Sequence, residues 1–254
     1  MSDLALATTG LTKSFGDLVA VAGIDLHVPR GSFYGFLGPN GAGKSTTIKC
    51  LTGLLRPTGG TYRILDMDPL ADPVAVKRKV GVVPEDLALF DRLSGAETLA
   101  FVGQVHGLDR ASLTKRSEEL LTLMDLTRAA GDLVADYSHG MKKKIALAAA
   151  LLPAPRLLFL DEPFEGVDAV ASRQIKDLLT AFVRGGGTVF LTSHILEIVE
   201  RLCDHIGIIQ KGRMIAEGPI DVLRGAAGGT LEERFLELVG AERTQTQTID
   251  WLAG

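Results

Sequence analysis

The sequence predicts an α/β fold: a mixed, largely parallel sheet with flanking helices, an added N-terminal antiparallel β layer and a helical subdomain. Short apolar runs alternate with longer segments of helical spacing, which is typical of strands joined by helical crossovers. The first thirty residues instead alternate apolar and polar positions, as in an antiparallel layer with one wet face. Residues 87–137 contain no convincing strand. Together these three observations predict the fold class.

Five apolar runs are the candidate strands of the parallel sheet. They are rich in Val, Ile, Leu and Phe and alternate little, which suits strands covered on both faces. They span residues 33–37, 80–84, 156–160, 188–192 and 205–210. In the antiparallel layer, strands are expected at residues 4–8 and 18–28.

Capping patterns mark the expected helices. Ser94 and Glu97 form a capping-box pattern that starts a helix running toward residue 106, and Gly107 and Asp109 are expected to close it. A second helical pattern follows over residues 112–124. We read this stretch as a helical insertion between two strands of the sheet.

The pattern also predicts how the chain divides into parts. Residues 1–86 and 138–225 are expected to form the core with its antiparallel β layer, and residues 87–137 the helical subdomain. A further capping pattern at Thr230 starts an amphipathic helix to Leu238, and the polar residues beyond Gly240 are expected to be frayed. Residues 226–254 therefore form a C-terminal helix and tail in this prediction.

Composition excludes several classes of protein. The 254 residues include 27 basic and 31 acidic ones, a net charge of −4, so the basic stripe of a nucleic-acid-binding protein is not expected. Two distant cysteines, Cys50 and Cys203, argue against a disulfide-rich secreted scaffold and for a reducing cytosol. The longest apolar stretch, residues 145–152, falls well short of the roughly 18 residues that a membrane-spanning helix needs. No signal peptide is read at the N-terminus, so work at a membrane would come through a partner.

A phosphate-binding loop is the most specific motif. Residues 38–46 match G-x-x-x-x-G-K-[ST] between a buried strand and a helix, where glycines let backbone N–H groups turn toward phosphate oxygens. Lys44 is expected to reach the β- and γ-phosphates, and Ser45 to bind Mg²⁺. The plainer alternative is a glycine-rich turn without a ligand. The candidate nucleotide-binding residues are Gly38, Pro39, Asn40, Gly41, Ala42, Gly43, Lys44, Ser45 and Thr46.

Two carboxylates end the apolar run at residues 157–160. Beside the phosphate loop, Asp161 would point at Mg²⁺, and Glu162 is the candidate base that holds the attacking water and accepts its proton. The alternative is an ordinary strand end with solvated acids. That alternative weakens because the phosphate loop lies in the same chain.

With these motifs in place, the chain resembles the nucleotide-binding subunit of ABC transporters over about residues 3–225. Residues 137–142 resemble the signature segment of that family, usually written L-S-G-G-Q, although His139 replaces a glycine. Residues 165–168 resemble the loop that contacts the second subunit, and residues 192–194 resemble the segment that contains the switch histidine. The motifs follow the order found in the family.

The resemblance implies roles for five further residues. Ser138 and Gly140 would contact the γ-phosphate of ATP held by the other subunit, so that two ATP molecules lie between two head-to-tail subunits. His194 would sense the γ-phosphate, Asp168 would meet the second subunit, and Phe15 would stack on adenine. Plainer alternatives are a buried strand-end histidine for His194, a helix cap for Asp168 and a core aromatic for Phe15.

Glu85 completes the implied metal-binding set with Ser45 and Asp161. It lies where the family has a loop, usually with Gln, that joins the helical subdomain to the core, senses Mg²⁺ and touches the membrane partner. Two weaker features receive structural interpretations. At least two of the three lysines at 142–144 are expected on a solvated helix face, and the Ala-rich residues 146–152 are expected in close helix packing rather than in a groove.

The predicted function is therefore ATP hydrolysis that drives a membrane transporter, with ATP and Mg²⁺ as cofactors. The expected partners are a second ATP-binding subunit, in a homodimer or a heterodimer, and a separate multi-span permease, with no nucleic acid. The protein would be cytoplasmic and peripheral on the inner face of the membrane, and the motifs resemble the multidrug and polysaccharide export branch. The alternative is a soluble relative that serves an assembly such as iron–sulfur cluster biogenesis. A phosphoryl-transfer kinase would leave the segment at 137–142 without a purpose.

Overall fold

The computed structural model describes residues 3–224 and 230–240. Its strands are β1 (Leu4–Phe15), β2 (Leu18–Pro29), β3 (Phe33–Leu37), β4 (Gly59–Ile64), β5 (Val80–Val83), β6 (Leu157–Asp161), β7 (Thr188–Ser193), β8 (His205–Gln210) and β9 (Arg213–Pro219). Its α-helices are α1 (Lys44–Leu51), α2 (Pro73–Lys77), α3 (Gly95–Val105), α4 (Arg110–Leu123), α5 (His139–Leu151), α6 (Ala169–Arg184), α7 (Leu196–Leu202), α8 (Ile220–Arg224) and α9 (Leu231–Leu238). A short 3₁₀ turn, Val134–Asp136, precedes α5.

The larger sheet has six strands in the order β5-β6-β7-β3-β8-β9. The strands β5, β6, β7, β3 and β8 are all parallel, and β9 pairs antiparallel with β8 at the edge. The carboxyl ends of the parallel strands therefore meet at one edge of the sheet, where ligands bind in open α/β folds. This topology brings together four loops that are far apart in the sequence.

Both faces of this sheet are buried, which explains why its strands alternate so little. The strands β3, β6 and β7 are buried along their whole length. Leu158 and Leu160 pack in a core with α5, α6 and α7, while Leu157 and Phe159 pack on the other face with α1 and the antiparallel sheet. Successive side chains of a strand point to opposite faces, so each face of β6 needs its own apolar residues. The mixed, largely parallel sheet predicted from the sequence is confirmed.

The antiparallel layer is also confirmed, with one strand more than predicted. It is a three-stranded sheet in the order β2-β1-β4, and β1 and β2 run further than the expected ranges. The strand β4 was not predicted because it opens with two glycines, and Gly60 has a φ of 78°. The edge strand β9 was missed as well. It forms a hairpin with β8 through Lys211 and Gly212, which have φ angles of 48° and 76°, a two-residue connection of the kind that twisted hairpins favour.

The capping patterns set the helix starts as expected, with one error. Ser94 and Thr230 each form a complete capping box, at the starts of α3 and α9. Asp109 does not close α3. Its carboxylate accepts a hydrogen bond from the Ser112 N–H and caps the start of α4, because Asp is preferred before a helix. Gly107, with a φ of 73°, follows the end of α3.

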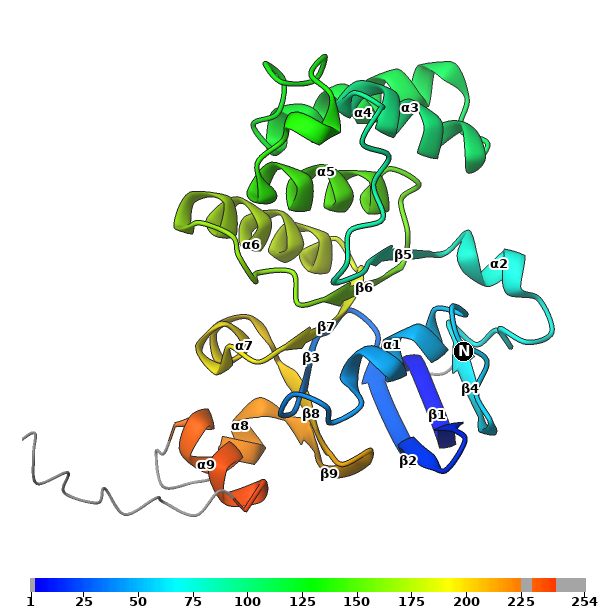
Figure 1. Cartoon of the computed structure of the whole chain (residues 1–254), viewed down its shortest axis with the longest axis vertical. Helices are drawn as coiled ribbons and strands as arrows, with labels where there is room; N and C mark the ends of the chain where they lie inside the picture. The colour runs from blue at the N-terminus through cyan, green and yellow to red at the C-terminus, as the bar shows by residue number, and fades with distance from the viewer. Residues whose placement is uncertain (1–2, 225–229, 241–254) are drawn as a thin grey trace, which may run out of the picture.

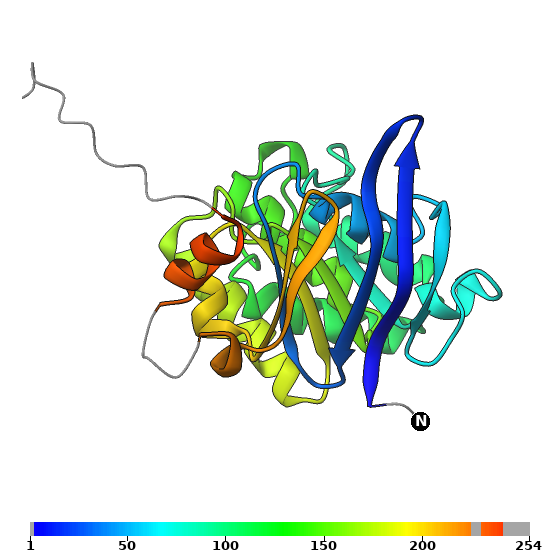
Figure 2. The same ribbon diagram turned by 90° about the horizontal axis from the view of Figure 1, so that it is seen from below.

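The views in Figures 1 and 2 show how these parts surround the sheet. Helices α3, α4 and α5 lie together above β5 and β6, and the β1–β2 pair lies at the opposite end of the molecule beside α1 (Figure 1). Seen from below, β1 and β2 lie on the opposite side from α9 (Figure 2). The tail predicted for residues 241–254 lies outside the described residues. No helix in the described part of the chain is long and apolar enough to cross a membrane.

Candidate functional site

The predicted phosphate loop connects the end of the central strand β3 to helix α1. Gly43 stands at the N-cap of α1 with a φ of 109°, and no side chain caps the helix. A Cβ at Gly43 would lie 2.5 Å from the carbonyl oxygen of Ala20, and one at Gly38 would lie 2.3 Å from the carbonyl oxygen of Ile209. These glycines are required by space and by backbone conformation. The uncapped N–H groups of α1 stay available to an anion.

Lys44 is held at this loop by the loop's own carbonyl groups. The side chain is buried, and its Nζ donates hydrogen bonds to the carbonyl oxygens of Gly38, at 2.7 Å, and Pro39, at 3.4 Å. The Thr47 hydroxyl donates to the Gly43 carbonyl at 2.8 Å. The ammonium group is thus fixed next to the loop by partners that carry no formal charge, so its positive charge is available to an anion in the loop.

Asp161 and Glu162 end β6, and a buried threonine on β7 holds both. The Thr192 hydroxyl donates to Oδ1 of Asp161 and accepts the backbone N–H of Glu162 at 3.0 Å. Asp161 and Thr192 are partners in the parallel register of β6 and β7. All three residues are buried, so this single hydroxyl fixes the direction of the acidic strand end.

Glu162 and His194 form a pair at the carboxyl ends of β6 and β7. The Nδ1 atom of His194 lies 3.0 Å from Oε2 of Glu162, and the His194 backbone N–H donates to the same oxygen at 3.3 Å. The Glu162 side chain is 8% exposed, whereas the His194 side chain is 47% exposed. The buried strand-end histidine considered as an alternative is therefore wrong for His194. The imidazole contacts the carboxylate on one side and remains open on the other.

The predicted phosphate loop, Glu162, His194 and Glu85 line one cavity of about 530 Å³. The loop residues come from β3–α1, Glu85 from the segment after β5, Glu162 from β6, and His194 from β7. The cavity is lined by Phe15, Leu18, Ala20, Asn40, Gly41, Ala42, Gly43, Lys44, Ser45, Thr46, Glu85, Glu162, Glu165 and His194. Four strand ends thus supply one polar site at the edge of the sheet.

Phe15 lies at this cavity and is not a core residue. Its side chain is 47% exposed at the end of β1. The Nζ of Lys13 lies 4.8 Å from the centre of its ring, close enough for a cation–π contact. The core-aromatic alternative is therefore wrong, and the partly exposed ring lies at the edge of the polar site.

The remaining candidates lie outside the cavity. Ser138 begins α5, as expected, and its hydroxyl accepts the Met141 N–H at 3.2 Å. Asp168 caps α6 by accepting the N–H groups of Val170 and Ala171, each at 2.9 Å. These hydrogen bonds, first that from Ala171, lower the pKa of the Asp168 carboxyl. The helix cap considered for Asp168 is therefore present, and its meeting with a second subunit stays a prediction.

Asp168 and the start of α5 are neighbours on the surface. A Cβ at Gly140 would lie 3.5 Å from Oδ2 of Asp168, and one at Gly166 would lie 3.0 Å from the ring of His139. Ser138, His139 and Asp168 are exposed. The family resemblance implies that both segments contact a second subunit, and in this chain they lie side by side on the surface.

The oxygen atoms of Ser45, Asp161 and Glu85 lie close enough together to suit a metal cation. Ser45 Oγ lies 3.4 Å from Oδ1 of Asp161 and 3.5 Å from Oε2 of Glu85. No cluster of three or more His, Cys, Asp or Glu side chains suited to a metal occurs among residues 3–224 and 230–240. A cation here would complete its shell with water and phosphate oxygens, as Mg²⁺ usually does. The oxygen-only donor set matches that ion.

One structural expectation about α5 is wrong, and another is confirmed only in part. Lys143 and Lys144 are buried, at 3% and 8% exposure, although at least two of the three lysines were expected in solvent. Residues 146–152 pack closely in the core, as expected, but Ala146, Ala149 and Ala150 also line a groove. Both results arise because α5 is covered on several sides, by β5, α3, α4 and α6. Its sequence shows little amphipathic contrast from which a buried face could be assigned.

Three residues near the site were not among the sequence candidates. Thr192 bridges Asp161 and Glu162, Glu165 lines the cavity, and the Nζ of Lys143 donates to the Glu162 carbonyl at 2.9 Å. Thr192 could have been found from the pairing of β6 with β7, since it lies directly opposite Asp161. Nothing in the local sequence marks Lys143, because its contact depends on how α5 packs.

Comparison with known proteins agrees with this geometry. The family described as "ABC transporter" matches residues 21–165. The daunorubicin/doxorubicin resistance ATP-binding protein DrrA of Streptomyces peucetius is 40% identical over 89% of this chain and 69% of its own length. The Nod factor export ATP-binding protein I of Cupriavidus pinatubonensis is 39% identical over 88% of this chain and 69% of its own.

Two solved structures share the fold closely. An ATP-binding subunit of an ABC transporter aligns with a TM-score of 0.87 at 32% identity, covering 92% of this chain and 99% of the other. A dimeric ATP-binding cassette in a post-hydrolysis state, bound to ADP and Pi, aligns with a TM-score of 0.77 at 25% identity, covering 85% and 98%.

Proposed function

The chain belongs to the ABC transporter family of ATP-binding subunits, and from that premise we propose which of its residues bind and hydrolyse ATP and how they drive a membrane partner. It is an ATPase of this family. One observation carries the proposal. The phosphate loop, Glu85 and the Glu162–His194 pair all line the same cavity.

Glu162 is the proposed general base. Its carboxylate is nearly buried, faces the cavity and is held by His194, so it can accept a proton from a water molecule that attacks the γ-phosphate. His194 keeps the carboxylate in this direction and presents its exposed ring edge to the γ-phosphate. Catalysis of this kind depends on positioning more than on covalent chemistry.

Lys44 and the loop amides are the proposed phosphate ligands. The Lys44 ammonium would move from neutral carbonyl partners to the β- and γ-phosphates, which bind it more strongly because they are charged. Ser45, Asp161 and Glu85 would hold Mg²⁺, which, when bound, supplies positive charge that offsets the phosphate charge. Phe15 would stack on adenine with its exposed ring face.

A second ATP-binding subunit completes the site in this proposal. Ser138 and Gly140 lie outside the cavity of their own chain; Ser138 is exposed, and Gly140 is buried beside Asp168. The start of α5 would therefore contact the γ-phosphate bound to the other subunit. The dimeric relative bound to ADP and Pi supports the pairing of two such subunits. All proposed site residues are present in this chain, so a homodimer would contain two complete sites.

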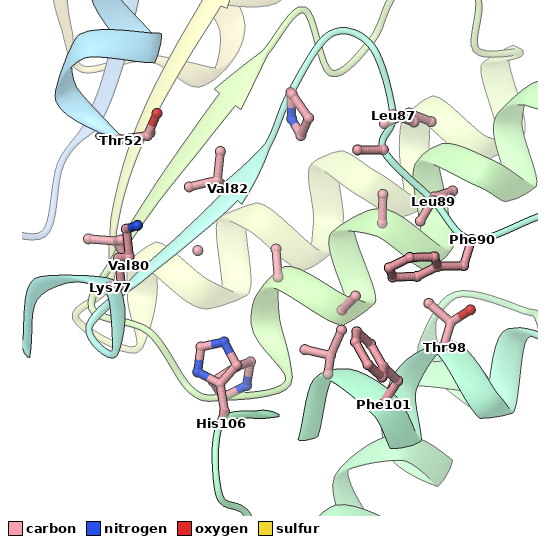
Figure 3. Close-up of a pocket in the computed structure, with 18 of the residues that line it drawn as sticks. Thr52, Lys77, Val80, Val82, Leu87, Leu89, Phe90, Thr98, Phe101 and His106 are labelled. Atoms are coloured by element: carbon pink, nitrogen blue, oxygen red, sulfur yellow. The ribbon is translucent and has the colours of Figure 1, made fainter. Parts of the chain in front are cut away.

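An apolar groove of about 400 Å³ is the proposed docking place for the membrane subunit. Figure 3 shows that Leu87 and Phe90 come from the segment after β5, and that Phe101 comes from α3. Phe90 and Phe101 are 55% and 43% exposed and make an edge contact with ring centres 5.2 Å apart. Exposed aromatic rings that line an apolar groove are typical of a surface that receives a partner.

One loop connects the groove to the nucleotide cavity. Glu85 lines the nucleotide cavity, and its neighbours Pro84 and Leu87 line the groove. A change in the cation and phosphates at Glu85 would therefore shift the residues that the permease touches. Residues 87–137 would move with this loop as the helical subdomain, against the core formed by residues 1–86 and 138–225.

Export is the proposed direction of transport. The relatives reported above are named for drug resistance and for export of a Nod factor, and none of these names points to iron–sulfur assembly. We place the protein on the cytoplasmic, inner face of the cell membrane, held there by its permease. Nucleic acid is not among the proposed partners, since the net charge is −4.

The variant Glu162→Gln tests the assignment of the base. We expect hydrolysis to fall about 100-fold or more because the amide cannot accept the proton, while ATP binding persists and an ATP-bound dimer accumulates. Phosphate release and size-exclusion chromatography with Mg²⁺ and ATP measure both effects. Glu165→Gln is a matched control, since Glu165 lines the same cavity without a hydrogen bond to His194. Hydrolysis by Glu162→Gln at the parent rate would refute the assignment.

A further inference from the structure

Lys143 is a buried lysine that the proposed reaction has not used. It lies on α5, is 3% exposed, and donates from Nζ to the carbonyl oxygen of Glu162 at 2.9 Å through a buried hydrogen bond. Lysine is rarely buried to this extent unless it is paired. Here the donor meets the backbone of the proposed base.

The backbone of Glu162 needs external support. Its φ is 48°, in the left-handed region that residues with a side chain adopt only when their surroundings hold them there. The Glu162 N–H donates to the Thr192 hydroxyl at 3.0 Å, and the Glu162 C=O accepts Lys143 Nζ at 2.9 Å and, at a longer 3.3 Å, the Glu165 N–H. Side chains from two different elements, β7 and α5, thus fix both peptide groups of this one residue.

The charges near Lys143 fit an anchoring role. Burial lowers the pKa of its ammonium group, and four carboxylates oppose that shift: those of Glu165, Glu85, Glu162 and Asp161. Three of the four, those of Glu85, Glu162 and Glu165, line the nucleotide cavity. Lys143 therefore lies near the carboxylates that line the cavity, whereas Lys44 lies in the phosphate loop.

We propose that Lys143 is a positioning residue that ties the backbone of Glu162 to helix α5, so that the position of α5 decides how the Glu162 carboxylate is aimed. This inference rests on the proposed role of Glu162. The N-cap of helix α5 is Ser138, in the segment proposed to meet the other subunit's nucleotide, and Lys143 follows about 1.4 turns later. A displacement of the helix start by the partner's nucleotide would therefore reach the base of the chain's own site.

Lys143→Met tests this link because methionine keeps the apolar length and removes the donor. In the full chain with Mg²⁺ and ATP, we expect kcat to fall about tenfold or more, as for a displaced base, with KM changed by less than about threefold. We expect Lys143→Arg, which keeps a donor, to recover about a third or more of kcat. Lys176→Met, on the neighbouring helix α6, is the matched control, since that half-buried lysine lies near the Phe164 ring.

Thermal unfolding sets the temperature at which activity must be compared. Lys143→Met takes a donor from a buried carbonyl and a positive charge from four nearby carboxylates, so we expect its unfolding midpoint to fall below that of the parent. Rates are therefore measured where both proteins are fully folded, and a kcat within about twofold of the parent there would overturn the proposal. A rise in KM that accounts for the whole loss of kcat/KM would overturn it as well.

A double variant distinguishes failure of this inference from failure of the proposed function. If Lys143 acts through Glu162, adding Lys143→Met to Glu162→Gln should lower the residual rate by less than about twofold. Additive losses would show that Lys143 acts elsewhere and would overturn the inference while the base assignment stands. The base assignment itself is decided by Glu162→Gln alone.

Discussion

Two helix starts in this molecule are built for different purposes. Helix α1 begins at Gly43 with no side-chain cap and opens into the 530 Å³ cavity. Helix α5 begins at Ser138, whose hydroxyl caps its own helix, and Ser138 is exposed and outside that cavity. The start of α1 has uncapped N–H groups and Lys44 beside a cavity, whereas the start of α5 is capped by its own serine and lies on the open surface.

The difference shows what one chain can do alone. The α1 side contains the loop amides, Lys44 and the Glu162–His194 pair, so we expect it to bind ATP in a single subunit. Ser138 is exposed and lies outside the cavity, so we expect the α5 side to contribute only when a second subunit covers it. Variants on the α1 side should therefore weaken ATP binding, whereas variants on the α5 side should reduce hydrolysis and leave ATP binding unchanged.

Lys44→Ala should have the largest effect because it removes the charge at the α1 side. Loss of charge-assisted hydrogen bonds to phosphate should weaken ATP binding by about 100-fold or more, and hydrolysis should fall with it. Equilibrium binding of a fluorescent ATP analogue measures this. Lys49→Ala, an exposed lysine on the same helix, is the control, and unchanged binding by Lys44→Ala would contradict the loop assignment.

Ser138→Arg should block the contribution of the α5 start to a second subunit and leave ATP binding at the α1 side intact. A long cationic side chain at the exposed start of α5 would obstruct closure of two subunits. The other subunit's ATP would then lose the hydrogen-bond donors at the start of α5, which should lower hydrolysis by about 100-fold. ATP binding to the monomer should stay within about twofold of the parent, because Ser138 does not line the cavity. Sedimentation with ATP reports the missing dimer. Full hydrolysis by this variant would mean that the α5 start is not shared between subunits.

Phe15→Ala should have the smallest effect on ATP hydrolysis, and it tests whether the α1 side also binds the adenine base. A stacked base is worth about 1–3 kcal/mol, so we expect KM for ATP to rise about tenfold with little change in kcat. Phe15→Trp should restore KM, since it keeps an aromatic face. An equal loss for GTP and ATP would agree with stacking, and no change in KM would show that the exposed ring is not used.

Some parts of the structure could be predicted from local sequence alone. The glycines, Lys44 and Ser45 have a fixed spacing between strand and helix, so the loop is a local feature. The capping boxes at Ser94 and Thr230 are local for the same reason. The strands β4 and β9 escaped prediction because one opens with glycines and the other is a half-buried edge strand, so neither shows a clear apolar run.

The site shows the same division. Asp161, Glu162 and His194 lie at recognisable strand ends. The phosphate loop in the same chain indicated the roles of Asp161 and Glu162, and the family resemblance indicated that of His194. Asp109 and the lysines of α5 were misread because their roles depend on the next helix and on what covers α5. Thr192 was given no role of its own, because that role requires knowing that β7 lies beside β6.

The sequence by itself determined the phosphate loop, the acidic strand end and the family to which the chain belongs, because each of these depends on residues close together in the chain. Only the tertiary structure decided that four strand ends share one cavity, that Lys143 holds the Glu162 backbone, and that one loop borders both the cavity and the apolar groove. These contacts arise from strand order and helix packing, which join residues too distant in sequence for any local spacing to encode.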